Sequence, residues 1–483
     1  MPRSSNSRAS GGAEHGAVDA DYLEKRQLKK GAAGWVLLAT LGVSYVISGD
    51  FAGWNLGIAT GGFGGMLIAT VLMALMYSAM VLSLAELSSS IPTAGGGYSF
   101  ARRALGPWGG YITGTAILLE YAIAPAAIAI FIGGYVESLV GLDGPLVYAA
   151  FYLVFVGIHL WGAGEALRIM MGITALAVLA LLVFIFSMLP HFDAARLFDI
   201  APGDAVGASS FLPEGYMGIW GALPFAMWLF LAVEGVPLAA EESREPGRDM
   251  PKGIIAAMSL LLLFAICMLL LVPGGAGAAA MSTSAAPLVD ALASVYGEGS
   301  MLASFVNVVG LFGLIASFFS IIFGYSRQVF ALSRAGYLPR VLSITNRRRA
   351  PTLALIVPGV IGFLLSLTGQ GDLMITMAVF GATISYAMMM LSHILLRRRE
   401  PDLARPFRTP GGVFTSATAL VLAVIAFLST FVVSLQAALW AGVFYAIMLA
   451  WFGFYSRHHL VAQAPEEEFD AIQRAESGLR SSP

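Results

Sequence analysis

The segment A-G-W-V-L-L-A-T-L-G-V-S-Y-V-I-S-G-D-F-A-G-W-N-L-G-I-A, residues 33–59, is apolar along nearly all of its length. It is long enough to cross a bilayer, because ~20 helical residues span the hydrocarbon core. Its middle reads S-G-D-F-A-G (48–53), where two glycines and an acid interrupt the apolar run. Irregular backbone at that depth is tolerated only where protein or a watery cavity satisfies its polar groups. We therefore expect a membrane helix that is broken beside a binding site.

The composition of the whole chain agrees with a membrane protein. Of its 483 residues, 58% are hydrophobic and 12% are charged, whereas an average soluble protein has about 25% charged residues. So few charges cannot cover a soluble globule, which excludes a soluble enzyme and a disordered chain. The net charge of -2 gives no sign of a nucleic acid or another polyanion as partner. The single cysteine, Cys267, excludes an internal disulfide and a zinc site built from cysteines.

Apolar segments of similar length recur along the chain and predict an all-α integral membrane protein with twelve transmembrane helices. We expect these helices at 33–59, 63–89, 106–138, 145–163, 168–189, 216–243, 252–273, 299–325, 352–369, 372–396, 413–435 and 437–455. The remaining large segments are polar. They comprise an N-terminal tail (1–32), a surface loop (190–215) and a C-terminal tail (456–483).

The positions of Lys and Arg support this count of helices. With both termini on one side of the membrane, 26 of the 27 basic residues fall on that side, and only Arg196 falls on the other. Short cytoplasmic loops of membrane proteins carry an excess of basic residues. The sequence therefore predicts that both termini lie in the cytoplasm.

A second interrupted segment, A-V-E-G-V-P (232–237), lies in the sixth predicted helix. Five helices separate the two breaks, so the five-helix units 33–189 and 216–396 begin in opposite orientations, with 413–455 outside both. Interrupted helices at matching positions of inverted halves are typical of a transporter with a binding site near the midplane. We expect the two breaks to meet there.

Six motifs between the predicted helices carry a family resemblance. They are A-E-L-S-S-S-I-P-T-A-G-G-G-Y (85–98), A-L-G-P-W-G-G-Y (104–111), A-E-E-S-R-E-P-G-R-D-M-P (240–251), S-R-Q-V-F-A-L-S-R-A-G-Y-L-P (326–339), N-R-R-R-A-P (346–351) and R-R-R-E-P-D-L-A-R-P-F-R-T-P-G (397–411). Over 33–455 the chain resembles the amino acid–polyamine–organocation superfamily of secondary transporters. The resemblance implies the five-plus-five inverted-repeat fold of the leucine and arginine transporters, without a cofactor, a metal site or an enzymatic activity.

Three further segments, K-R-Q-L-K-K-G-A-A-G-W (25–35), V-I-S-G-D-F-A-G-W-N (46–55) and L-L-E-Y-A-I-A-P (118–125), resemble bacterial ethanolamine permeases. This resemblance implies import of ethanolamine, or a similar small amine alcohol, across a bacterial cytoplasmic membrane by alternating access. A carrier of cationic amino acids or polyamines remains an alternative. A membrane enzyme acting on a lipid head group would need a histidine or metal cluster, which six scattered histidines do not offer. A non-transporting amine sensor would need a regulatory domain.

Amino acid carriers of the superfamily have a G-S-G-hydrophobic-F pattern in the first helix, whose backbone N–H groups hold the substrate carboxylate. This chain has Ile47, Ser48, Gly49, Asp50 and Phe51 at these positions. A carboxylate at Asp50 would repel a substrate carboxylate and attract an ammonium group, which favours an amine without an acid group. Alternatively, Asp50 caps the second half of the broken helix.

The sixth helix resembles the W-x-F-x-G-x-E pattern of arginine/agmatine exchangers through Trp228, Phe230 and Glu234, with Ala232 in place of the glycine. The resemblance implies that Trp228 stacks on a cationic substrate and that Glu234 acts in gating or proton coupling. A packing role for Trp228 is the alternative. Because the breaks are expected to meet, Asp50 and Glu234 should face one small cavity.

Glu120 and Tyr121 lie inside the third predicted helix, where an acid is a candidate site for substrate or protons. An interhelical hydrogen bond is the alternative for Glu120. The coupling ion is either a proton or sodium. Ser317 and Ser320 match the hydroxyls that sodium-coupled relatives use in the eighth helix, although such serines also bond to their own backbone. Nothing in the sequence indicates an oligomeric state.

Overall fold

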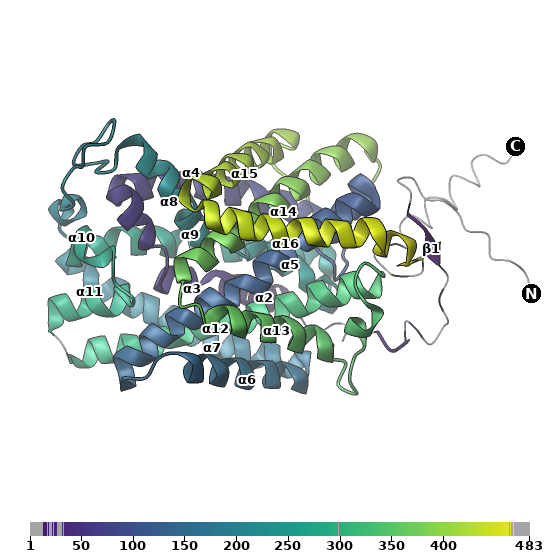
Figure 1. The fold of residues 1–483 in the computed structure, drawn as a ribbon, viewed down its shortest axis with the longest axis horizontal. Helices are drawn as coiled ribbons and strands as arrows, with labels where there is room; N and C mark the ends of the chain where they lie inside the picture. Colours follow the sequence, from purple (N-terminus) through teal and green to yellow (C-terminus); the bar gives the residue numbers. More distant parts are fainter. Residues whose placement is uncertain are drawn as a thin grey trace, which may run out of the picture.

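Helices form nearly all of the structure, a computed structural model that describes residues 13–16, 18, 22, 24–26, 31, 33–297, 299–462, 464 and 467. They make one bundle (Figure 1). Its first helices are α2 (Trp35–Val46), α3 (Ser48–Phe51), α4 (Leu56–Ser90), α5 (Gly97–Val140), α6 (Pro145–Trp161) and α7 (Ala163–Met188). The next are α8 (Gly215–Trp228), α9 (Pro246–Ala276), α10 (Ala278–Met281), α11 (Pro287–Tyr296), α12 (Met301–Arg334), α13 (Thr352–Ser366), α14 (Gly371–Arg399), α15 (Val413–Val433) and α16 (Leu435–Phe454). The 3₁₀ helices are η1 (Leu189–His191), η2 (Ala194–Phe198), η3 (Val233–Glu242), η4 (Arg340–Ser343) and η5 (Ser456–His458).

In the part of the chain that the structure describes, nine helices are long and apolar enough to cross a membrane. Four shorter apolar helices accompany them, at Trp35–Phe51, Pro145–Trp161, Pro287–Tyr296 and Thr352–Ser366. Each of the twelve segments expected from the sequence coincides with a helix or with consecutive helices. The sequence did not predict α10 and α11, which fill the connection between α9 and α12. This is an all-helical, multi-pass membrane protein.

Two expected helix boundaries differ because a glycine bends the chain without ending the helix. Within α4 the backbone turns at Gly62, where φ is 66°, so α4 holds both the end of the first predicted helix and the second. Within α5 it turns at Gly106, where φ is 79°, so α5 begins nine residues before the third predicted helix. Glycine adopts these positive φ angles at little cost.

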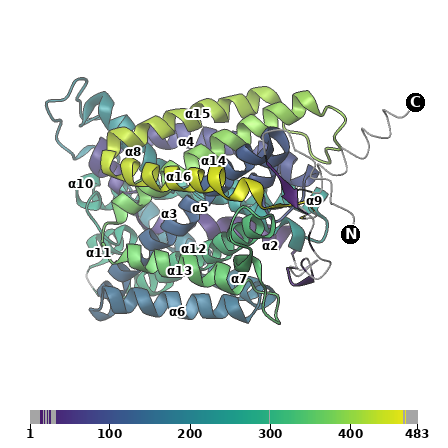
Figure 2. The same ribbon diagram turned by 45° about the vertical axis from the view of Figure 1, so that its right-hand side comes forward.

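Helices from the two halves of the chain pack side by side in the bundle. The helices α5 and α14 lie along each other, as do α4 with α8 and α2 with α9. In both views α6 and α15 lie on opposite sides (Figures 1 and 2). The largest fully buried side chains include Tyr45, Tyr77, Tyr121 and Tyr386. Buried tyrosines bring hydroxyl groups that need partners, so the interior of the bundle is polar as well as apolar.

The first break lies a few residues later than the sequence predicted. Ser48 to Phe51 are helical as α3, and the non-helical backbone is Ala52 to Asn55. The helix continues through α3 because the N–H of Ala52 still donates to the carbonyl oxygen of Ser48 at 3.1 Å. It ends where Gly53 takes a φ of 92°, a conformation that favours glycine.

The second break begins earlier than its predicted start, at the end of α8. After Trp228 the chain makes a turn, and the tighter helix η3 follows from Val233 to Glu242. The turn needs a left-handed residue, and Ala232 supplies it with a φ of 75°. A residue with a Cβ pays about 1–2 kcal/mol for that conformation. The glycine expected here from the family pattern would adopt this angle without strain.

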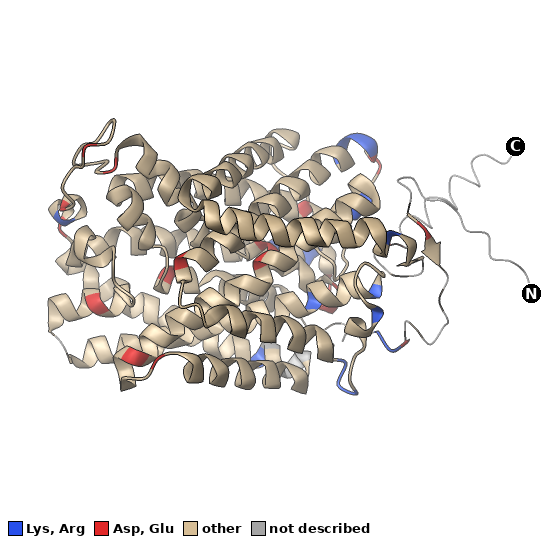
Figure 3. Cartoon of the chain, viewed as in Figure 1, with Lys and Arg blue, Asp and Glu red and all other residues tan. Residues whose placement is uncertain are grey.

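Basic residues gather at one end of the bundle. Figure 3 shows Lys and Arg mainly at the end that carries β1 (His15–Gly16), and mainly Asp and Glu at the other end. There β1 pairs in parallel with β2 (Leu460–Val461). Nearby, Glu467 accepts hydrogen bonds from Arg102 and from the Tyr337 hydroxyl. The described parts of both chain ends therefore lie on the same face.

Glu86 at the end of α4 organises one of the loop motifs. Its carboxylate accepts hydrogen bonds from Arg397, from Arg405 Nε at 2.9 Å and from the backbone N–H of Thr409 at 2.7 Å. These partners belong to the motif at 397–411, which follows α14. Glu86 thus anchors that loop to the end of α4.

Candidate functional site

The two helix breaks meet inside the bundle, as the inverted repeat predicted. Trp228 at the end of α8 donates from its indole N–H to the carbonyl oxygen of Ala52 at 3.0 Å. The backbones approach closely because Gly49 has no side chain: a Cβ there would lie 2.6 Å from the carbonyl oxygen of Trp228. In this conformation the indole, expected to stack on a cation, ties one break to the other.

Side chains hold two backbone N–H groups around the first break, one at the start of α3 and one in the break itself. The N–H of Ser48 donates to Ser317 Oγ at 2.8 Å, and the N–H of Gly53 donates to Asn55 Oδ1 at 3.2 Å. The amide nitrogen of Asn55 donates in turn to two backbone carbonyls at and just beyond the end of α10. In this conformation these two N–H groups are therefore not offered to a substrate carboxylate.

The two candidate serines of α12, Ser317 and Ser320, have different hydrogen-bond partners. Ser317 Oγ is the acceptor for the first break, whereas Ser320 Oγ donates to the carbonyls of Ala316 and Ser317 at 2.8 and 3.1 Å. Ser320 thus makes the bonds to its own helix that membrane serines commonly make. Ser317 ties α12 to the break, and a part in ion coupling stays a prediction.

Two acids and three tyrosines from four elements form a buried group that we call the acid–tyrosine cluster. Its members are Glu120 and Tyr121 of α5, Glu234 of η3, Tyr77 of α4 and Tyr386 of α14. Glu234 accepts from the Tyr121 hydroxyl at 2.7 Å and from the Tyr386 hydroxyl at 2.8 Å. Tyr386 Oη also lies 3.3 Å from Glu120 Oε1. The Tyr77 hydroxyl donates to Tyr386 Oη at 3.2 Å. All five side chains are at most 3% exposed.

The hydroxyl protons of the cluster suffice for only one ionised acid. Tyr121 and Tyr386 each carry one hydroxyl proton, and both protons go to Glu234, which accepts as a carboxylate does. The second Glu120 oxygen, Oε2, has no hydrogen-bond partner among the described residues. A buried carboxylate without donors is costly. We infer that Glu120 is protonated in this conformation and that its hydroxyl faces the Glu234 carboxylate and the Tyr386 oxygen.

Among the described residues, no basic side chain pairs with these acids. Glu120 and Glu234 bond to tyrosine hydroxyls and to each other. The nearby Arg327 is already paired, with its Nη2 at 2.8 Å from Glu242 Oε1. The remaining negative charge is therefore open to neutralisation by a proton or by a cationic substrate.

Asp50 does not join Glu234, contrary to the prediction that both face one cavity. It is buried in α3, which packs against α2, α9 and α12, while Glu234 faces α5 and α14. Neither carboxylate oxygen of Asp50 has a partner among the described residues, so the capping interpretation is also wrong for this conformation. The reason is the phase of the helix: adjacent residues point about 100° apart, and Gly49, not Asp50, faces the second break.

The two predicted phenylalanines pack against helices that surround the site. The Phe51 ring lies against Gly313 of α12, where a Cβ would overlap it, and the Phe51 carbonyl accepts from the Tyr135 hydroxyl at 3.0 Å. The Phe230 ring lies 5.5 Å from the ring of Tyr77, centroid to centroid. Phe51 therefore supports the first break, and Phe230 forms a wall of the acid–tyrosine cluster.

Tyr77, Tyr386 and Asn55 were not predicted from the sequence. Their side chains have no local feature that distinguishes them from other polar residues in these segments. Their importance depends on partners far along the chain. Tyr77 and Tyr386, for example, are separated by 309 residues.

Ion pairs close the end of the bundle beyond the cluster. Arg327 pairs with Glu242, and Arg334 Nη2 lies 2.6 Å from Glu241 Oε1. Both arginines belong to α12, and both acids lie at the end of η3. Because η3 also carries Glu234, these pairs connect the site to the basic end of the bundle.

A membrane bundle with two broken helices that meet at a buried polar site has the design of a secondary transporter. Comparison with known proteins agrees, since residues 34–453 match the model of the amino acid permease family. An uncharacterized transporter of Rhizobium meliloti (strain 1021) is 28% identical over 429 residues, which cover 86% of this chain and 90% of that protein. The branched-chain amino acid permease BcaP of Bacillus subtilis (strain 168) is 26% identical over 402 residues, 77% of this chain and 82% of that protein.

The methylthioribose transporter of Bacillus subtilis (strain 168) is likewise 26% identical, over 399 residues, with 77% of this chain and 82% of that protein covered. The chain belongs to the amino acid permease family, within the amino acid–polyamine–organocation superfamily. It is a transporter and not an enzyme. The superfamily expected from the sequence is thus confirmed, and the family implies the inverted-repeat fold of the leucine transporter.

Proposed function

We propose that this protein imports ethanolamine, or a similar small amine alcohol, across the cytoplasmic membrane of a bacterium. In this proposal the chain crosses the membrane twelve times, with both termini in the cytoplasm. The observation that carries the substrate class is the acid–tyrosine cluster, whose two acids have no basic partner among the described residues. A small ammonium group would supply the missing positive charge.

The first break supports a substrate without a carboxylate. The N–H groups of Ser48 and Gly53 are bonded to Ser317 and Asn55, and the third buried acid, Asp50, lies within the same segment. A carboxylate entering here would compete with two existing hydrogen bonds and would meet a buried acid. An amine alcohol brings only N–H and O–H groups, which suit carboxylate and tyrosine oxygens.

The proton inferred on Glu120 supplies a route for coupling. A cationic substrate that approaches Glu234 strengthens its ionised form, while Glu120 carries its proton through the same conformational change. Release of both toward the cytoplasm would be symport. This account needs no sodium site and no histidine.

The test is uptake by purified protein in proteoliposomes, measured by counterflow of radiolabelled ethanolamine. Unlabelled ethanolamine should compete better than glycine, alanine or leucine. Stronger competition by glycine or leucine would assign the protein to amino acid import, which the name of the BcaP relative favours. Stronger competition by arginine or a polyamine would favour the cationic alternative. Imposed proton and sodium gradients, applied separately, identify the coupling ion.

The topology has its own test, after Cys267→Ala removes the native thiol. In this background Ser481→Cys should resist labelling by a membrane-impermeant reagent in whole cells and become labelled after lysis. Labelling from outside would contradict a cytoplasmic C-terminus.

A further inference from the structure

A tight turn between η4 and α13 holds three consecutive arginines at the surface. Asn346 closes this turn, since its backbone N–H donates to the Ala350 carbonyl at 2.9 Å and its Oδ1 accepts from the N–H groups of Arg348 and Ala350. Arg349 has a φ of 59°, where glycine or asparagine would be less strained. Arg347, Arg348 and Arg349 are all exposed. The turn therefore keeps a strained arginine, and three guanidinium groups, at one place.

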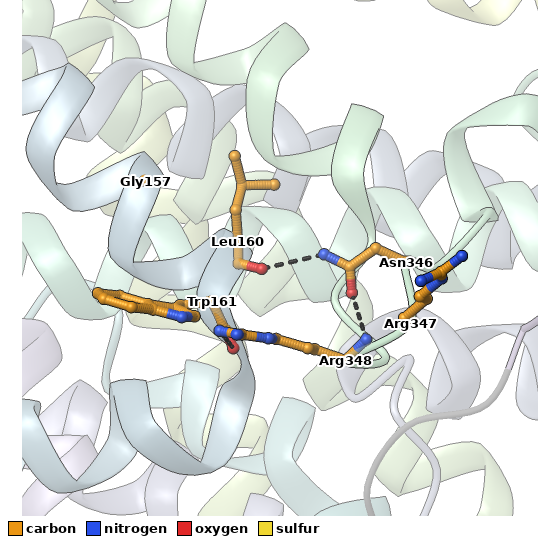
Figure 4. A pocket seen from close by; sticks show the side chains of 6 residues that line it. All are labelled: Gly157, Leu160, Trp161, Asn346, Arg347 and Arg348. Carbon is orange, nitrogen blue, oxygen red and sulfur yellow. Dashed lines mark hydrogen bonds between the residues drawn. The ribbon is translucent and has the colours of Figure 1, made fainter.

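The turn is fastened to the end of α6. Asn346 Nδ2 donates to the carbonyl of Leu160 at 3.0 Å, and Arg348 Nη1 donates to the carbonyl of Trp161 at 3.2 Å. The Arg348 guanidinium also lies 5.6 Å from the centre of the Trp161 ring. Residues of the turn and of the end of α6 line a cavity. Figure 4 shows the Arg348 side chain extending to Trp161 and the Arg347 side chain on the far side of Asn346. The cavity has a volume of about 470 Å³, and Gly157 completes its lining.

This cavity lies at the edge of the surface that faces lipid. Apolar side chains of α6 are exposed along the helix, with Leu146 at 87%, Leu153 at 76% and Trp161 at 61%. An exposed apolar helix in a membrane protein contacts acyl chains, and a tryptophan at its end is typical of the interface with head groups. The arginines of the turn therefore lie at the boundary between the lipid-facing surface of α6 and water.

The charge of the cavity selects the kind of head group. Among the residues described, no carboxylate pairs with Arg347, Arg348 or Arg349, and the cavity lining contains no acid. A zwitterionic head group would bring its ammonium close to these guanidinium groups with no anion to receive it. A phosphodiester without an ammonium meets no such repulsion, and arginine recognises phosphate oxygens with paired N–H donors.

We propose that this cavity binds the phosphodiester head group of an anionic phospholipid, such as phosphatidylglycerol. Arg347 and Arg348 contact the phosphate, Trp161 lies at the glycerol level, and the first acyl carbons follow Gly157 and Leu160 along α6. Basic pockets at the cytoplasmic ends of membrane helices recognise anionic lipids in this way. The site is separate from the acid–tyrosine cluster and does not depend on the identity of the transported substrate.

The test is native mass spectrometry of the purified protein with added phosphatidylglycerol, phosphatidylcholine or inorganic phosphate. The parent should retain phosphatidylglycerol in preference to phosphatidylcholine. Arg347→Gln/Arg348→Gln should lower the affinity for phosphatidylglycerol at least about tenfold, since each arginine near an anionic surface contributes about a fivefold effect. Arg347→Gln alone leaves the bonds to α6 intact and should lower it about fivefold.

The matched control is Arg398→Gln/Arg408→Gln, which removes two exposed arginines outside the cavity, one in the last turn of α14 and one in the loop that follows it. The control should bind phosphatidylglycerol like the parent, and all variants should keep the parent's unfolding temperature to within a few degrees. An equal loss of phosphatidylglycerol affinity in the control would show that net charge, and not the cavity, determines the binding. Equal retention of phosphatidylcholine, or displacement of the lipid by millimolar inorganic phosphate, would also overturn the proposal.

Discussion

Replacing Glu234 by glutamine tests the acid–tyrosine cluster most directly, because the side chain keeps its shape and loses its charge. Glu234 accepts from two tyrosine hydroxyls at 2.7 and 2.8 Å, so one hydroxyl would face the new amide nitrogen. An ammonium about 4 Å from the carboxylate, at an effective dielectric near 20, gains roughly 4 kcal/mol before desolvation. Even if desolvation cancels most of this, Glu234→Gln should weaken ethanolamine binding by at least about 1.4 kcal/mol, a factor of ten.

Glu120→Gln provides the comparison, because we infer that Glu120 is already neutral in this conformation. Its ethanolamine affinity should stay within about threefold of the parent, a difference below 1 kcal/mol. Its uptake should lose the dependence on external pH, since the proton carrier is gone. Uptake in Glu234→Gln should fall at every pH.

The assay is equilibrium binding of labelled ethanolamine to purified, monodisperse protein, followed by uptake across a pH series. Unfolding temperatures close to the parent's show that the variants are folded. If both variants bind and transport like the parent, the cluster is structural and the reasoning fails. In that case Asp50→Asn becomes the decisive variant, because Asp50 is the other buried acid at the breaks.

Three more predictions concern the backbone and the basic end. Ala232→Gly should raise stability by about 1 kcal/mol, seen as a higher unfolding temperature, because glycine adopts the φ of 75° without strain; a lower temperature would contradict this. Gly49→Ala should lower the free energy of unfolding by about 1–3 kcal/mol and abolish uptake, because the alanine Cβ would lie 2.6 Å from the Trp228 carbonyl oxygen. Normal transport would show that the two breaks need not approach each other. Burial raises the pKa of Glu467, but Arg102 outweighs it and holds the pKa below its ordinary value, so the pair stabilises the fold above about pH 4.3 and is lost as pH falls. Glu467→Gln should therefore lower the free energy of unfolding by about 3 kcal/mol at pH 7, and it should lose less stability than the parent as the pH falls below about 4.3; parallel pH profiles would refute the assignment.

The breaks were predictable because glycine, proline and acids stand out in apolar helices. Their exact limits were not, because the N–H of Ser48, at the start of α3, finds its acceptor on Ser317, 269 residues away. The direction of Asp50 failed for a related reason. A one-residue error in the position of a break rotates every side chain by about 100°, and the sequence does not give that position to within one residue.

The acids of the site and Tyr121 were found from the sequence, whereas Tyr77 and Tyr386 were not. A glutamate in a membrane helix is costly enough to be noticed on its own, as Glu120 and Glu234 were. A tyrosine such as Tyr386 is common in membrane helices, and its hydrogen-bonded partners come from α4, α5 and η3. Only the packing of these helices shows that one hydroxyl serves both acids.

The pairing of β1 with β2 bears on how the protein is made. Residues 15 and 16 leave the ribosome before α2 to α16, whereas their partners at 460 and 461 follow α16. This pairing therefore forms only after all of these helices have been synthesised. A chain that stalls before residue 460 lacks β2, and it also lacks Glu467, the partner of Arg102.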